Sequence, residues 1–131
     1  TQWFQRAVVA SPYNLNFLNK LGAGYMQTGN VNEAKKNFTK AITLQPNYKE
    51  SLGNLGYIFM LENNPGEAMK LLNRALAADP DYVQALLNKA LLLLTLKQQT
   101  EARKLILHIL NLQPNNQKAK SLLTQLSIGS Q

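Results

Sequence analysis

A period of 34 residues is the feature that most constrains the fold of this chain. Four of its five prolines fall at this spacing, and so do a column of alanines and a column of glutamates. The three columns are Pro12, Pro46, Pro80 and Pro114; Ala34, Ala68 and Ala102; and Glu33, Glu67 and Glu101. Because one step is shared by several residue types, it predicts an array in which each repeat is one supersecondary unit.

Each repeat is predicted to be a pair of amphipathic helices. Residues 15–28 and 31–45 carry apolar or small side chains at spacings of three and four, which places them on one helical face. In the first unit these side chains are Leu18, Leu21, Gly22 and Tyr25, followed by Ala34, Phe38, Ala41 and Ile42. Thr28, Gly29 and Asn30, which lie between the two stretches, have turn chemistry.

Residues 64–67 carry the clearest helix-start signal. Asn64 is a favourable N-cap, Pro65 suits the first helical position, and Glu67 stands three residues after the cap. The other periodic glutamates also fall where the helix dipole favours negative charge. Each second helix is expected to end before the next periodic proline, because the residue before a proline is disfavoured in the α region.

Small residues recur on both helices of each unit. Gly22, Gly56 and Ala90 share a column on the first helices, and the periodic alanines lie on the second helices. Removing bulk at both places lets the paired helices approach closely. The larger side chains expected to fill the space around these contacts are Tyr25, Phe59, Leu93, Phe38, Leu72 and Ile106.

The pattern of the units resembles the tetratricopeptide repeat. In the first unit the matching residues are Leu18, Leu21, Gly22, Tyr25, Ala34, Phe38, Ala41 and Pro46. The third unit departs most, since Lys89 replaces an apolar residue and Ala90 replaces glycine. A lysine can bury its stem while its ammonium stays in water. The resemblance implies an all-α fold, an α-solenoid of antiparallel helix pairs that forms a right-handed superhelix, with the first helices lining the concave face.

The repeats are expected to form a single domain over residues 1–131. Its expected parts are the second helix of a truncated unit at 1–12, complete units at 15–48, 49–82 and 83–116, and a polar capping helix at 117–131. Trp3 and Phe4 then have a side without an expected partner. More repeats preceding the chain, or another copy of it, are expected to cover that side.

The register of the resemblance places ten residues on the concave groove. They are Asn16, Asn19, Lys20, Glu50, Asn54, Tyr57, Gln84, Leu87, Asn88 and Leu91. Asparagine carries a donor and an acceptor, so Asn54 and Asn88 could hold the backbone of an extended peptide, with apolar anchors beside them. The alternative is that these asparagines pack neighbouring first helices together. An apolar, amide-rich partner segment fits this groove better than a highly acidic one.

Some members of the family bind the C-terminal carboxylate of chaperones through a clamp of lysines, asparagines and an arginine. Asn54 matches one clamp asparagine, but the other clamp positions are occupied by Asn19, Ala23, Gln84 and Asn88. Starting the pattern one repeat later keeps Asn88 and Lys118 but loses the rest. The resemblance therefore argues against binding of chaperone tails.

The second helices carry a periodic set of basic residues on the convex side. This possible basic stripe consists of Arg6, Lys36, Lys40, Lys70, Arg74 and Lys104. His108 continues the column of Arg6, Lys40 and Arg74 at the same 34-residue step. Such a stripe could meet an anionic partner. The alternative is that cations late in a helix complement its dipole. No aromatic residues interleave the stripe to stack bases, which argues against nucleic acid.

The remaining chemistry argues against an enzyme. The chain has one histidine and no cysteine, and no paired carboxylates or phosphate-binding glycine loop are evident, so no catalytic residue, metal site or cofactor is predicted. No apolar run is long enough to span a membrane. The absence of cysteine is compatible with a reducing compartment, and a soluble, cytoplasmic protein is the favoured interpretation. The net charge of +7 permits an acidic partner without requiring one.

The predicted function is a non-catalytic scaffold that binds a protein or peptide in the concave groove. Two alternatives stay open. One is a structural or self-association module, in which the N-terminal helix pairs with a copy of the chain to make a homo-oligomer. The other is a regulatory segment of a larger protein.

Overall fold

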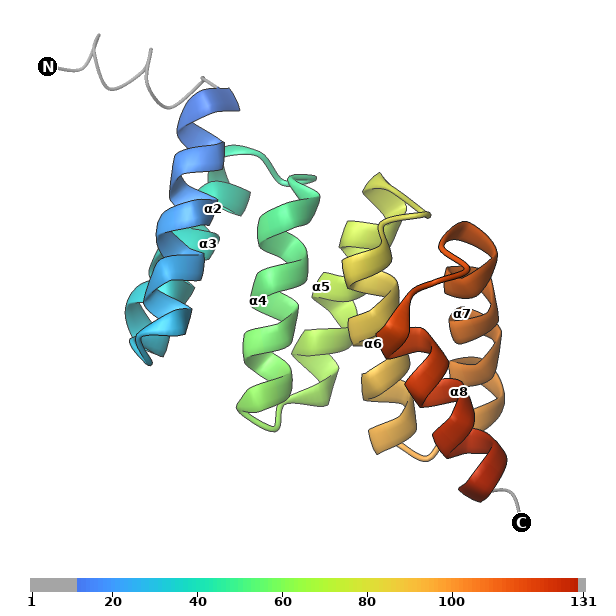
Figure 1. Ribbon diagram of the computed structural model, residues 1–131. Helices are drawn as coiled ribbons and strands as arrows, with labels where there is room; N and C mark the ends of the chain where they lie inside the picture. Colours follow the sequence, from blue (N-terminus) through green and yellow to red (C-terminus); the bar gives the residue numbers. More distant parts are fainter. Residues whose placement is uncertain (1–11, 130–131) are drawn as a thin grey trace, which may run out of the picture.

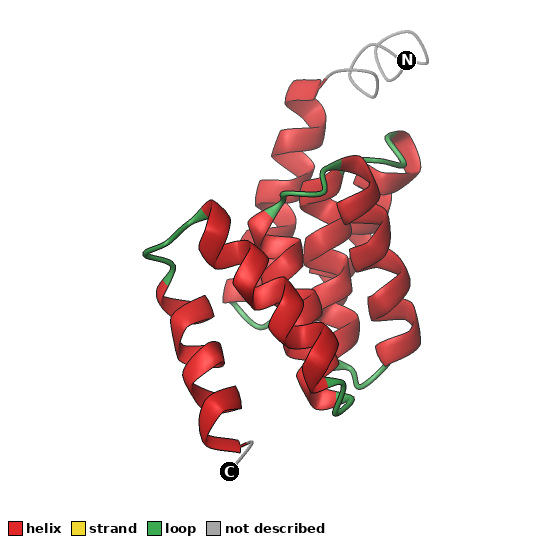
Figure 2. Cartoon of the chain, turned by 90° about the vertical axis from the view of Figure 1, so that its right-hand side faces the viewer, coloured by secondary structure: helices red, strands yellow, loops and turns green. Residues whose placement is uncertain are grey.

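The computed structural model describes residues 12–129, which form seven α-helices joined by short turns and contain no strand (Figures 1 and 2). The helices are α2 (Pro12–Gln27), α3 (Val31–Leu44), α4 (Lys49–Leu61), α5 (Pro65–Ala78), α6 (Val83–Thr95), α7 (Gln99–Leu112) and α8 (Gln117–Gly129). Helices α2, α4, α6 and α8 form one layer, and α3, α5 and α7 form the layer behind it (Figure 1). The predicted all-α solenoid of helix pairs is confirmed.

The observed helix bounds match the prediction closely, with one correction. Helix α2 begins at Pro12 rather than at residue 15, whereas α4 begins at Lys49, after the turn that follows Pro46. Proline is acceptable in the first turn of a helix, because its missing N–H would have no intrahelical partner there. The truncated unit predicted at 1–12, apart from Pro12, lies outside the described residues.

The three first helices that lead into a second helix all end in the same turn. The residue after each helix cap has a positive φ: 83° at Gly29, 58° at Asn63 and 63° at Lys97. In all three turns the next backbone N–H donates over 2.8 Å to a carbonyl five residues earlier; the pairs are Asn30 to Tyr25, Asn64 to Phe59 and Gln98 to Leu93. This is the Schellman motif, which satisfies carbonyls left unpaired at a helix end. Lysine lacks the conformational freedom that makes glycine the usual residue there.

The helix starts and stops follow from local chemistry. The Asn64 Oδ1 accepts the backbone N–H of Glu67 at 3.4 Å, with Pro65 in the first helical position, so the predicted N-cap is confirmed. The periodic glutamates lie in the first turns of α3, α5 and α7. Each of these helices ends before the periodic proline that follows it.

Close contact within each helix pair depends on the small residues. A Cβ added to Gly22 would lie 2.5 Å from Cε1 of Phe38, and one added to Gly56 would lie 3.0 Å from Cγ of Leu72. In the third pair Ala90 and Ile106 lie buried in one cluster. The residue packed against the glycine is aromatic in the first pair and aliphatic in the second. The two helices of a pair can approach closely at this contact because one of them carries little side-chain volume.

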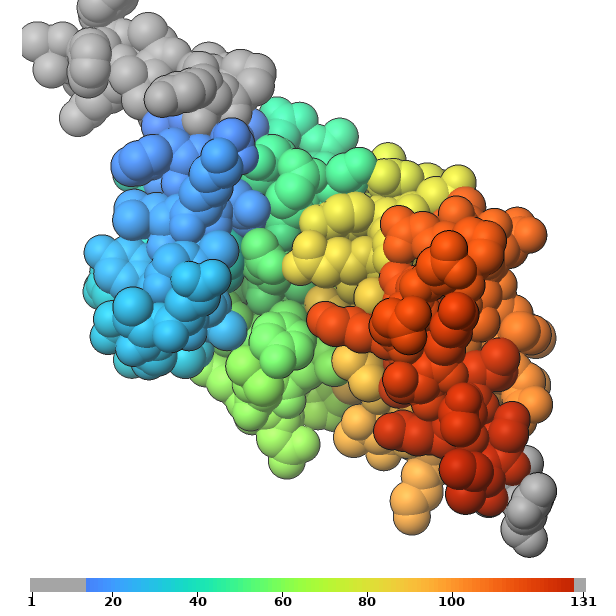
Figure 3. All heavy atoms as spheres, viewed as in Figure 1, coloured from blue at the N-terminus to red at the C-terminus, as the bar shows by residue number. Residues whose placement is uncertain are grey.

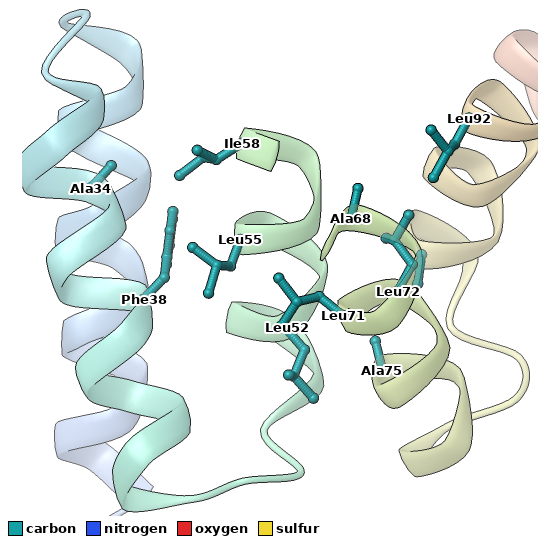
Figure 4. Packing of buried hydrophobic residues seen from close by; sticks show 11 residues of the cluster. Ala34, Phe38, Leu52, Leu55, Ile58, Ala68, Leu71, Leu72, Ala75 and Leu92 are labelled. Atoms are coloured by element: carbon teal, nitrogen blue, oxygen red, sulfur yellow. The ribbon is translucent and has the colours of Figure 1, made fainter. Parts of the chain in front are cut away.

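The hydrophobic core runs along the array rather than gathering at one centre. In Figure 4, Phe38 of α3 points towards Leu55 and Ile58 of α4, which ties one helix pair to the next. A second buried cluster joins α6, α7 and α8, and Leu76 of α5 packs against both clusters. The same stacking leaves the layer of first helices as one continuous face, which Figure 3 shows hollowed over α4.

Candidate functional site: the concave face

Two adjoining cavities lie on the face formed by the first helices. The first, of about 360 Å³, lies between α6 and α8 and is lined by Gln84, Leu87, Asn88, Leu91, Gln117, Lys118, Ser121 and Leu122. The second, of about 640 Å³, extends from α6 across α4 to α2 and is lined by Ala23, Met26, Phe38, Asn54, Tyr57, Val83, Gln84, Leu87, Asn88, Leu91 and Lys118. Because they share five residues, the two cavities form one groove, which we call the concave groove.

The cavities bring together six of the ten residues predicted for the groove. These are Asn54, Tyr57, Gln84, Leu87, Asn88 and Leu91. Asn16, Asn19, Lys20 and Glu50 line neither cavity. Lys118 and Leu122 line the groove as well, and they stand one repeat after Gln84 and Asn88. The groove is therefore displaced along the array towards α8.

A chain of hydrogen bonds ties α2, α4 and α6 together. The Tyr82 hydroxyl donates to Gln84 Oε1 over 3.1 Å. Gln84 Nε2 donates to Asn54 Oδ1 over 2.7 Å, and Asn54 Nδ2 donates to Asn19 Oδ1 over 3.0 Å. Ser51, which is fully buried, donates its hydroxyl to the same Asn19 oxygen over 2.8 Å. Both ends of the Asn54 amide are therefore used within the protein.

Tyr82 titrates differently from an ordinary tyrosine. Partial burial raises the pKa of its hydroxyl to about 12, and the negative charge of Glu50 adds to the effect. The Lys49 ammonium lies 5.1 Å from the centre of the Tyr82 ring and pairs with Asp79 at 2.5 Å. The hydroxyl thus stays protonated and keeps donating to Gln84 throughout the neutral range.

Asn88 has the same repeat position as Asn54 but different surroundings. It is 9% exposed, and its side chain makes no hydrogen bond with any described residue. It lines both cavities. Its side-chain nitrogen and oxygen still reach the surface of the cavity, since no buried side-chain N or O atom of the described residues lacks a partner, and they are therefore accessible to water or a ligand. The structure therefore separates two asparagines that the sequence placed in one class.

Apolar side chains form the walls of the groove around Asn88. Tyr57 is 39% exposed and Leu91 is 37% exposed, although both lie among packed helices. Leu92 and Leu93, the neighbours of Leu91 in a run of four leucines, are buried. One side of that run therefore faces the groove and offers apolar surface to a ligand.

The predicted basic stripe on the convex side is largely balanced by nearby acids. Lys36, Lys70 and Lys104 lie 3.2, 3.5 and 3.4 Å from the carboxylates of the periodic glutamates three residues before them. Arg74 donates to the carbonyl of Pro46 over 2.8 Å, and His108 lies 2.9 Å from Asp81. Arg6 lies outside the described residues, and Lys40 has no such partner among the described residues. These contacts favour the structural interpretation of the stripe.

Within residues 12–129 no group of three or more histidine, cysteine, aspartate or glutamate residues is placed to hold a metal ion. Nor does the described part of the chain contain a helix long and apolar enough to cross a membrane.

Comparison with known proteins identifies the family. A sequence model described as tetratricopeptide repeat matches residues 25–81 and 59–126, and together these segments cover most of the chain. The chain therefore belongs to the tetratricopeptide repeat family. No curated protein matches it in sequence.

Several solved structures share the fold. The first tetratricopeptide domain of Spaghetti (RPAP3), bound to an HSP90 peptide, has a TM-score of 0.84 at 23% identity, and the match covers 92% of this chain and 95% of that one. The first such domain of human RPAP3 has a TM-score of 0.82 at 25% identity, covering 89% and 92%. Pseudomonas aeruginosa PilF has a TM-score of 0.81 at 27% identity, covering 88% and 53%.

Proposed function

We propose that this chain is a non-catalytic scaffold that binds an extended segment of a partner protein in the concave groove. The observation that carries the proposal is the groove itself, in which the partly exposed Tyr57 and Leu91 line the same cavity as Asn88, whose amide makes no hydrogen bond with the described residues. Apolar walls with a few polar groups are the usual composition of a ligand site. The family and the relative that holds an HSP90 peptide add support.

The chaperone clamp remains a disfavoured version of this function. The Spaghetti domain shares the fold at 23% identity, but fold alone does not transfer a ligand. Here the clamp positions hold Asn19, Ala23, Gln84 and Asn88. Two of these, Asn19 and Gln84, are hydrogen-bonded to Asn54. We therefore propose a partner other than a chaperone tail.

The test is affinity capture from a lysate of the source cells followed by mass spectrometry. The groove variant combines Tyr57→Ala with Leu91→Ser, two half-exposed positions at which substitution costs little stability. The matched control combines Lys36→Ala, Lys70→Ala and Lys104→Ala on the convex side. Circular dichroism first confirms that both variants are folded. Partners lost only with the groove variant support the proposal, and partners lost only with the convex variant contradict it.

Self-association is a second candidate, favoured by one observation. Phe17 is 55% exposed and Leu21 is 37% exposed on α2, whereas the residues one repeat later, Ser51 and Leu55, are buried against the preceding helix pair. This end of the array therefore offers an apolar face of the kind that the repeat elsewhere covers. Sedimentation over a range of concentrations tests the candidate: a mass that stays monomeric contradicts it, and a dimer lost on Phe17→Ser supports it.

A further inference from the structure

The outer face of α2 departs from the pattern of the other first helices. Figure 1 shows α2 at one end of the described array, with α4 on its inner side. The residues one, two and three repeats after Phe17 are small and fully buried; they are Ser51, Ala85 and Ala119. Phe17 has instead a large side chain that is more exposed than buried.

Gly24 departs from the pattern in the opposite direction. The residues at the same place in the later repeats are large and buried; they are Ile58, Leu92 and Leu126. A Cβ added to Gly24 would have no atom of the described residues within 4 Å. Because Phe17, Leu21 and Gly24 are spaced by four and three residues, they lie on one face of α2. That face has a projection at Phe17 and a hollow at Gly24.

This shape disfavours a preceding helix pair in the regular geometry of the array. The Ser51 hydroxyl lies 2.8 Å from Oδ1 of Asn19, so the place that Phe17 has in the repeat directly contacts the preceding first helix. A phenylalanine there would push that helix away. Glycine would also leave a void at the place where Ile58 packs in the cluster that contains Phe38 (Figure 4).

The same face is complementary to itself. When two α2 helices lie antiparallel, Phe17 of each copy faces Gly24 of the other, and Leu21 of both copies lies near the twofold axis. A large side chain that enters a space on the facing helix is the packing found in coiled coils. Since a twofold axis uses one surface twice, one projection and one hollow are sufficient for two identical contacts.

We infer that the chain forms a twofold dimer through antiparallel α2 helices, with Phe17 of each copy packed over Gly24 of the other. The inference rests on the self-association candidate and gives it a partner surface and a register. Helix α3 lies behind α2 in Figure 1, and the twofold axis is perpendicular to the plane of the two α2 helices. The concave faces of both copies therefore lie on the same side of the dimer, where Ala23 and Met26 of α2 line the second cavity.

Charge and size together predict a weak dimer. Lys20 is the only charged residue of α2, so no ion pair stabilises the contact, and the net charge of +7 on each copy opposes association. The helix has 16 residues and is about 24 Å long. One helix from each copy provides less than the roughly 800 Å² per partner of a standard interface. We expect a Kd on the order of 10–100 μM, which should decrease as salt screens the repulsion.

The first experiment is sedimentation equilibrium over a range of protein and salt concentrations. Gly24→Leu should weaken the dimer about tenfold, because leucine fills the hollow. The variant should stay folded by circular dichroism, since the added side chain has open space and leucine favours a helix over glycine. Gly66→Leu, the same substitution at another open glycine, is the matched control on α5 and should change the Kd less than about twofold.

An exchange of the two residues sharpens this test. Phe17→Ala combined with Gly24→Phe moves the projection to position 24 and the hollow to position 17, so its Kd should return to within about threefold of the wild-type value. A non-specific apolar contact predicts instead that Gly24→Leu dimerises better, since it adds apolar surface. If Gly24→Leu dimerises as well as the wild type, the inference is overturned and the self-association candidate stands. A wild type that stays monomeric at millimolar concentration overturns both, whereas affinity capture tests groove binding independently.

The second experiment tests the register by disulfide formation, which is straightforward because the chain has no cysteine of its own. Phe17→Cys and Gly24→Cys are oxidised separately and as a mixture. In the proposed dimer the two cysteines of a mixed pair face each other, whereas those of either variant alone lie about 10 Å apart along the helix axes. Because a disulfide needs closer Cα atoms, the mixture should form linked dimers about tenfold faster. Faster linking of either variant alone indicates another register and contradicts the inference.

Discussion

The first and third helix pairs, α2–α3 and α6–α7, have the same fold but reach it with different residues. The first pair keeps Gly22 against Phe38 and turns at Gly29. The third pair places Ala90 near Ile106 and turns at Lys97, although lysine disfavours a positive φ. The leucines that line the groove lie on α6 and α8, whereas the first pair contributes Ala23, Met26 and Phe38. The two pairs therefore share one fold but give different side chains to the groove.

The largest effect on stability is expected for Gly22→Ala, which gives α2 the alanine that α6 has at the same repeat position. Gly22→Ala places a Cβ 2.5 Å from the ring of fully buried Phe38, so either the ring or the helix must shift. We expect a loss of about 1–3 kcal/mol in the free energy of unfolding, as for other overpacked cores. Urea denaturation followed by circular dichroism measures it.

The close contact between Gly22 and Phe38 predicts a rescue. Phe38→Ile added to Gly22→Ala recreates the combination of the third pair. The double variant should be more stable than the sum of the two single changes predicts, by about 1 kcal/mol, because the two sites are in contact. Strict additivity would show that the clash does not determine the packing of this pair.

A smaller effect, of opposite sign, is expected at the turn of the third pair. Lys97→Gly should stabilise the protein by about 1 kcal/mol, because glycine adopts the observed φ of 63° without a steric penalty. Lys97→Ala is the control, since it removes the charge and length of the side chain but keeps the penalty. If both variants gain equally in melting temperature, charge rather than backbone conformation is the cause.

The smallest effect concerns the junction between the second and third pairs. Hydrogen bonding to Lys49, and to the backbone N–H of Asp81, lowers the pKa of Asp79. Its contribution to stability is therefore present above the ordinary aspartate pKa and is lost as the pH falls through the folded value. Between about pH 6 and about pH 3 the wild type should lose slightly more melting temperature than Asp79→Asn. Glu101→Gln, which removes an exposed pair within one helix, serves as the comparison.

The repeat made most of the fold predictable from sequence. A period of 34 residues with small residues at fixed positions is enough to place the helices and the close contacts within pairs. Two further local features of the structure also have a signal in the sequence. Glu33 and Lys36 have the spacing of an ion pair on one helical face, and the column of Gly29 and Asn63 continues to Lys97. The start of α2 at Pro12 could not be inferred from the other repeats, because α4 follows a different turn.

The division between Asn54 and Asn88 could not be predicted. Both are asparagines at one repeat position, and their chemistry is set by residues one repeat away on neighbouring helices. Asn54 has Asn19 on one side and Gln84 on the other. The residue one repeat after Gln84 is Lys118, which makes no bond to Asn88. A lysine also has no acceptor, so it can serve only one half of an amide.

The hydrogen-bonded chain from Tyr82 to Asn19 also has a mechanical consequence. Short polar links of fixed length fasten α2 to α4 and α4 to α6, so the curvature of that stretch resists change. No such link joins α6 to α8 among the described residues. We therefore expect the distance between α6 and α8 to vary more than the distances between α2, α4 and α6, so that the groove widens or narrows at its α8 end.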